Sequence, residues 1–66
     1  MTVVVNGDPV EVPPGATVAD LVEQLGLGTR GVVVERNGQP VARPAMTTTA
    51  LADGDRLELV RAVAGG

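Results

Sequence analysis

Apolar and polar positions alternate in short stretches along this chain, which is the pattern of half-buried strands. The first two stretches, Thr2 to Asn6 and Val10 to Val12, flank the turn dipeptide Asn6-Gly7. Asn and Gly both tolerate positive φ, so the dipeptide favours a β-hairpin. Pro13 to Gly15 then ends the hairpin, because proline cannot donate a hydrogen bond to a strand ladder.

A helical period comes after the hairpin. One apolar stripe is formed by residues at positions i, i+3, i+4 and i+7, namely Val18, Leu21, Val22 and Leu25. Thr17 is a suitable N-cap, Asp20 three residues later favours a capping box, and Gly26 is placed to end the helix. A helix of about ten residues is too short to be stable alone. Its stripe therefore predicts a sheet that the helix covers.

Three more strands are predicted in the second half of the chain. They are Val32 to Arg36, Pro40 to Ala42 and Arg56 to Val63. A second Asn-Gly pair joins the first two of them, and the leading proline of the short one suggests a sheet edge. The stretch Arg43 to Ala50 has no period and is expected to cross the surface, with Met46 and Leu51 tucked under it. Asp53-Gly54-Asp55 is interpreted as a turn rather than as a pair of catalytic carboxylates.

The order of these elements is β-β-α-β-β-β, which predicts an α+β fold. A right-handed crossover through the helix is the permitted connection, and the last strand is expected to return beside the first. That arrangement is the β-grasp (ubiquitin-like) fold, a mixed sheet of about five strands covered on one face by one helix. We expect a single domain over residues 1–66, with 61–66 as a flexible C-terminal tail.

Composition excludes several kinds of chemistry. The chain has no Cys, His, Lys or aromatic residue, so the commonest nucleophiles, general bases and metal ligands are missing, and we expect neither an enzyme nor a metal site. The net charge of −3 argues against a nucleic-acid partner. No apolar run reaches the ~20 residues of a membrane span, and the N-terminus lacks a signal-peptide pattern. The expectation is a cytoplasmic monomer that contacts neither nucleic acid nor membrane.

The C-terminal stretch "RAVAGG" ends on two glycines. One interpretation is that chain ends fray and tolerate glycine. The other is that the terminus itself is the working part of the molecule, presented by the folded domain before it.

Three stretches together resemble the ThiS family of ubiquitin-like sulfur carriers: "VNGDPVEVPPGATVADLVEQLGL", "NGQPVARP" and "LADGDRLELVRAVAGG". The resemblance covers nearly the whole chain. It implies that an E1-like (ThiF-like) adenylyltransferase adenylates the Gly66 carboxylate, and that a donor such as a cysteine desulfurase then converts it to a thiocarboxylate. It further implies that a ThiG-like thiazole synthase takes this sulfur for thiazole formation in thiamine biosynthesis. The carrier is expected to bind no cofactor, since the resemblance implies that ATP is used by the activating enzyme.

The resemblance also assigns the site. Gly66 is the residue modified, and the tail residues Val63, Ala64 and Gly65 are expected to thread into a partner. Partner docking is predicted on the uncovered sheet face. The period of two that places Thr2, Glu11 and Glu58 outward also places Val4 and Val60 outward, on adjacent central strands, where they are expected to form one apolar patch.

One loop departs from the family pattern. Members often carry a proline before the arginine of this loop and an aromatic residue soon after it, whereas here Ala42 precedes Arg43 and "PAMTTTA" has no ring. Two other functions stay open. One is a sulfur carrier for another pathway, similar to the small subunit of molybdopterin synthase. The other is a ubiquitin-like interaction domain with no carrier role.

Overall fold

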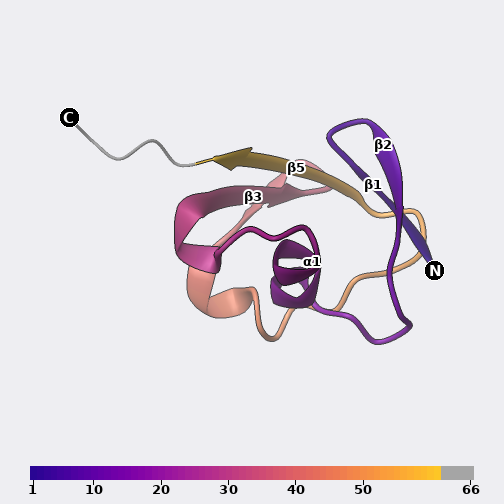
Figure 1. Cartoon of the computed structure of the whole chain (residues 1–66), viewed down its shortest axis with the longest axis horizontal. Coiled ribbons are helices and arrows are strands. Elements are labelled where there is room, and N and C mark those ends of the chain that lie inside the picture. Colours follow the sequence, from indigo (N-terminus) through magenta and orange to yellow (C-terminus); the bar gives the residue numbers. More distant parts are fainter. Residues whose placement is uncertain (62–66) are drawn as a thin grey trace.

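The computed structural model describes residues 1–61 (Figure 1). These residues form a helix, two short 3₁₀ turns and five strands: β1 (Thr2–Val5), β2 (Asp8–Glu11), α1 (Val18–Gln24), η1 (Thr29–Gly31), β3 (Val32–Arg36), β4 (Gln39–Val41), η2 (Arg43–Ala45) and β5 (Arg56–Arg61). The predictions for Val63, Ala64, Gly65 and Gly66 lie outside the described residues.

The strands form one mixed sheet in the order β2-β1-β5-β3-β4. β5 runs parallel to β1, whereas β1 with β2, β3 with β4 and β3 with β5 are antiparallel. α1 lies on one side of this sheet (Figure 1). The last strand has therefore returned to the centre beside the first, which confirms the predicted β-grasp fold. Strand β4, which contains Pro40 as its second residue, is at an edge, also as predicted.

The core lies between α1 and the sheet. Three of the four stripe residues, Val18, Leu21 and Val22, are fully buried. The prediction was wrong for Leu25, which is 39% exposed, because α1 ends one residue before it. The remaining buried apolar side chains are Val3, Val5, Val12, Ala16, Val32, Val34, Met46, Leu51, Leu57 and Leu59. Met46 and Leu51 thus lie under the irregular crossing, as expected.

Both ends of α1 are fixed by local hydrogen bonds. At the N-terminus, Thr17 and Asp20 form the predicted capping box, each side chain accepting from the other residue's backbone N–H. At the C-terminus, Gly26 has a φ of 77° and donates to the carbonyl of Glu23 at 2.9 Å. Leu27 donates to the carbonyl of Val22 at 3.0 Å. These two bonds make a Schellman motif, which stops the helix and turns the chain toward β3.

Both Asn-Gly pairs form hairpin turns with positive φ at each residue. The φ values are 49° and 88° at Asn6-Gly7, and 51° and 82° at Asn37-Gly38. This is the backbone that two-residue hairpins prefer. The two asparagine side chains also reach β5, one from each flanking hairpin. The central strand is therefore held on both sides by turn residues.

Candidate functional site

β5 is the strand that leads to the C-terminal residues. Its last residue, Arg61, is paired with Val32 of β3. The predicted tail of residues 61–66 included Arg61, which belongs to the strand, and residues 62–66 lie outside the described residues. The strand lies between β1 and β3. The described part of the chain therefore ends on a strand in the middle of the sheet.

The side chain of Asn6 anchors β5 near this end. Its Nδ2 donates to the carbonyl of Leu59 at 3.0 Å, and its Oδ1 accepts from the N–H of Leu59 at 2.9 Å. The backbone N–H of Asn6 donates to the carbonyl of Leu57 at 2.9 Å. β1 ends at Val5, so the Asn6 amide continues the pairing where the backbone of β1 turns away. Sequence reasoning assigned Asn6 to the turn alone and missed this second role.

The start of β5 is held by a buried carboxylate, Asp55. It accepts hydrogen bonds from Arg36 Nε at 2.8 Å, from Asn37 Nδ2 at 3.0 Å and from the N–H of Ala52 at 2.8 Å. Burial by itself raises the pKa of Asp55, but the Ala52, Asn37 and Arg36 hydrogen bonds and the Arg36 charge outweigh it, so its pKa lies below the usual value. Asp55 therefore ties the β3–β4 turn to β5.

The other carboxylate of this turn is also engaged. Asp53 accepts from the N–H of Thr2 at 2.8 Å, and Gly54 between the two acids has a φ of 85°. The turn interpretation of Asp53-Gly54-Asp55 is thus confirmed, and both acids have structural partners. In the part of the chain that the structure describes, no three acidic, His or Cys residues are grouped as a metal site would require.

The uncovered sheet face carries two exposed valines side by side. Val60 of β5 is 62% exposed and is paired with Val33 of β3, which is 56% exposed. Val4 is on the same face, as its alternation with the buried Val3 and Val5 requires, but it is half-buried. We call Val33 and Val60 the apolar pair.

The expected patch of Val4 and Val60 does not form. Val4 is aligned with Arg56, four residues before Val60 on β5. Because β5 runs parallel to β1 and extends beyond its end, Val60 finds its apolar neighbour on β3 instead. The outward orientation was predicted correctly and the neighbour was not. The docking role of either valine stays a prediction.

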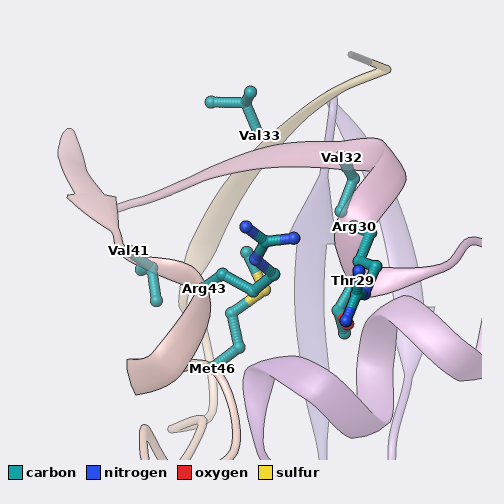
Figure 2. A pocket seen from close by; sticks show the side chains of 7 residues that line it. All are labelled: Thr29, Arg30, Val32, Val33, Val41, Arg43 and Met46. Carbon is teal, nitrogen blue, oxygen red and sulfur yellow. The ribbon is translucent and has the colours of Figure 1, made fainter.

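A hollow of about 240 Å³ lies beside β3, on the face of the sheet that α1 covers. Val33 is among its lining residues, but its side chain points away from the hollow, on the opposite side of β3 from Val32 and Met46 (Figure 2). Figure 2 shows its walls: η1 with Arg30 on one side, η2 with Arg43 on the other, and Met46 below. The complete lining is Thr29, Arg30, Val32, Val33, Val41, Arg43 and Met46. Sequence reasoning missed this hollow, since it joins two loops without periodic pattern. The only signal was the pair of arginines beside those loops.

Comparisons with known proteins agree with this geometry. The architecture defines a β-grasp domain whose central strand leads to the C-terminus. The chain belongs to the ThiS family, which it matches over residues 3–66. No helix within residues 1–61 is long and apolar enough to cross a membrane.

Two solved structures are similar over the whole chain, and both are of a thiamine biosynthesis protein from Geobacter metallireducens. The crystal structure of that protein, described as ThiS, is 33% identical with a TM-score of 0.83, and the match covers 100% of both chains. The solution structure is 33% identical with a TM-score of 0.80, and the match covers 100% of this chain and 88% of the other.

Two curated relatives are thiazole synthases. That of Paramagnetospirillum magneticum is 38% identical over 66 residues, and that of Magnetococcus marinus is 33% identical over 66 residues. In both cases the match covers 100% of this chain but 20% of the relative. The chain thus spans about a fifth of the length of the curated relatives that it matches.

Proposed function

We propose that this protein carries sulfur for thiazole formation in thiamine biosynthesis, as a thiocarboxylate on Gly66. The observation that carries the proposal is the match to the ThiS family over residues 3–66, which includes the Gly-Gly pair. The position of β5 supports it, because a central strand held by Asn6 and Asp55 is a rigid base for the residues after it.

The chemistry requires activation of the Gly66 carboxyl group. With a reference pKa near 3.5, a free C-terminal carboxyl group is ionised at neutral pH and is a poor electrophile. Attack of its oxygen on the α-phosphorus of ATP forms an acyl-adenylate and releases pyrophosphate. A sulfur nucleophile from a persulfide donor then attacks the acyl carbon and AMP leaves. Reductive cleavage of the S–S bond by a thiol leaves the thiocarboxylate.

The carrier contributes access rather than a catalytic side chain. Gly65 and Gly66 leave the acyl carbon unhindered. The five residues after Arg61 span at most about 17 Å when extended. This reach lets Gly66 enter a partner's active site while the sheet stays outside. Ordering those residues costs about 1–2 kcal/mol each, so contacts elsewhere on the surface must offset several kcal/mol.

The same scheme implies three partners. They are an E1-like adenylyltransferase that uses ATP, a sulfur donor such as a cysteine desulfurase, and a thiazole synthase that accepts the sulfur. The thiazole synthases of Paramagnetospirillum magneticum and Magnetococcus marinus support the last partner, because each contains a region similar to this whole chain. We propose that the carrier itself is a cytoplasmic monomer and binds no cofactor.

The test is the intact mass of the protein after incubation with ATP, the adenylyltransferase and the sulfur donor. We expect replacement of one oxygen by sulfur, located on Gly66 by fragmentation. A matched sample without ATP should keep its original mass. An unmodified protein, with an enzyme that modifies another carrier in the same assay, would contradict the proposal. A thiocarboxylate that the thiazole synthase does not consume would assign the carrier to another pathway.

A further inference from the structure

We propose that Pro9 and Pro40 close the two edges of the sheet to a further strand, so that two copies of this chain do not pair edge to edge. The described sheet has the order β2-β1-β5-β3-β4, so β2 and β4 are its edges. Each edge strand has a proline as its second residue, and each follows an Asn-Gly turn. This property is independent of the proposed function, because it concerns only how folded domains associate.

An edge strand exposes backbone N–H and C=O groups that can bind the edge strand of another molecule. In an antiparallel pair, residues alternate along each strand. The N–H and C=O of one residue point to the partner strand, and those of the next point away from it. On an edge strand the second kind of residue faces outward. An edge is therefore open to a further strand only if its outward residues can donate and accept hydrogen bonds.

Pro9 occupies an outward position of β2. The amino group and carbonyl of Met1 bond the carbonyl and N–H of Val12, each at 2.9 Å. Alternation from this bonded pair makes Val4 and Pro9, which are aligned, a pair whose backbone groups point away from each other. The N–H of Val4 accordingly donates to the carbonyl of Asp55 at 2.8 Å, toward β5. Pro9 therefore faces outward, where any other residue would offer an N–H.

Pro40 occupies the equivalent position of β4. Leu59 directs its N–H and C=O to the Asn6 side chain, on the β1 side, so those of Glu58 point to β3. Glu58 is aligned with Glu35, whose backbone groups therefore point to β5 and away from β4. Glu35 is aligned with Pro40 on its other side, so Pro40 faces outward. It is the middle residue of a three-residue strand, so β4 itself offers no outward N–H to an added strand.

The two edges differ in what else protects them. On β2 the next outward residue is Glu11, whose carbonyl already accepts from Gln24 Nε2 of α1 at 2.8 Å. Asp8 and Glu11 are exposed carboxylates, so two copies paired through β2 would also bring like charges together. β4 has the sequence QPV and no charge. Pro40 is therefore the main protection of its edge, and its substitution should have the larger effect.

The experiment measures the average mass in solution of the wild type, Pro9→Ala, Pro40→Ala and the double variant by sedimentation equilibrium over a range of protein concentrations. Alanine restores the N–H. Two copies paired through β4 gain two hydrogen bonds, so the dimerisation constant of Pro40→Ala should exceed that of the wild type at least about tenfold. One open edge in each copy closes into a two-fold dimer, whereas the double variant should assemble beyond the dimer.

The matched control is Pro14→Ala. Pro14 is exposed in the turn after β2, so its substitution frees the unfolded chain in the same way but adds no N–H to a sheet edge. Circular dichroism shows whether each variant keeps its fold. Pro40→Thr is the second variant at that position, because it also restores the N–H and threonine suits a strand.

Hydrogen exchange locates the contact. The N–H that Pro40→Ala introduces should be protected from exchange at high protein concentration and exposed at low concentration. Folded Pro40→Ala and Pro40→Thr proteins that sediment like Pro14→Ala over the whole range would overturn the proposal. Association without protection at position 40 would overturn it too, since the contact would then lie elsewhere. A wild type that already pairs along β4 would show that Pro40 does not close this edge.

Discussion

The side-chain amide of Asn6 forms two hydrogen bonds with the backbone of Leu59, as donor at 3.0 Å and as acceptor at 2.9 Å. The residue that starts the first hairpin turn thus also completes the pairing of the last strand, 53 residues away in sequence. A turn residue near one end of the chain thus holds the strand that comes last in the described residues.

We predict that Asn6→Gly destabilises the protein although glycine suits a φ of 49°. The substitution leaves the N–H and C=O of Leu59 without their partner, which costs about 1–3 kcal/mol. Asn6→Asp keeps an acceptor for the N–H of Leu59 and loses the donor to its carbonyl, so it should fall between glycine and the wild type. Urea unfolding followed by circular dichroism measures the free energies. Equal stability of Asn6→Gly and wild type would show that the amide is not an anchor.

We predict that the protein loses stability in acid because Asp55 becomes protonated. The pKa of this carboxyl group is lowered on folding, so its ionised form stabilises the folded state above the unfolded-state value of 3.8. This contribution should disappear as the pH falls from 3.8 through the folded-state pKa. Asp55→Asn should cost about 1–3 kcal/mol at neutral pH, because the buried side chain loses its charge-assisted bond to Arg36.

The measurement compares unfolding free energies of wild type and Asp55→Asn between neutral pH and about pH 3. The difference in unfolding free energy between wild type and Asp55→Asn should become smaller below pH 3.8, because protonated Asp55 is neutral like asparagine. Asp53→Asn is the matched control from the same turn, on a residue that is exposed. A difference between wild type and Asp55→Asn that stays constant over the whole range would contradict the prediction.

Most of the fold could be predicted because its signals are local. A capping box, a helical stripe and an Asn-Gly turn each depend on residues a few positions apart, and all three were identified from sequence. Leu25 shows the limit of such patterns. Its spacing continues the stripe, but the Schellman motif at Gly26 already fixes the end of the helix.

The site was predicted less well because it depends on register between distant segments. A period of two sets which face Val4 and Val60 occupy, but their separation depends on how far β5 runs past β1. No local pattern encodes that offset. The hollow between Arg30 and Arg43 could not be predicted from a local pattern either, since two irregular loops bring the arginines to one place. The hydrogen bonds from the Asn6 side chain to Leu59 were not predicted, because the Asn-Gly turn already accounted for an asparagine at this position.

We predict that Val60→Asp leaves the fold intact and weakens activation of the terminus. Val60 is 62% exposed, so the substitution should change the free energy of unfolding by about 1 kcal/mol or less. A charge on the apolar pair, beside Glu58, should lower the rate of thiocarboxylation about tenfold or more. Val4→Asp should have the smaller effect, since Val4 lies opposite Arg56 and away from the apolar pair.

Initial rates from intact mass, together with unfolding curves, test the prediction for Val60. Val60→Thr is the matched control for shape, because threonine is β-branched and uncharged. An unfolded Val60→Asp protein would show that Val60 belongs to the core. A folded variant that is modified at the wild-type rate would remove the apolar pair from the docking surface.

The final prediction separates a carrier from an interaction domain. Deleting Gly65 and Gly66 should leave the domain folded, since the described elements end at Arg61, but should abolish thiocarboxylation. Adding one alanine after Gly66 is the matched variant, because it keeps both glycines and moves the carboxyl group to a residue with a Cβ. Both proteins should fail to restore thiazole-dependent growth to a host that lacks its own carrier. Growth restored by the deletion variant would show that contacts of the folded domain suffice, and the two glycines would then have no chemical role.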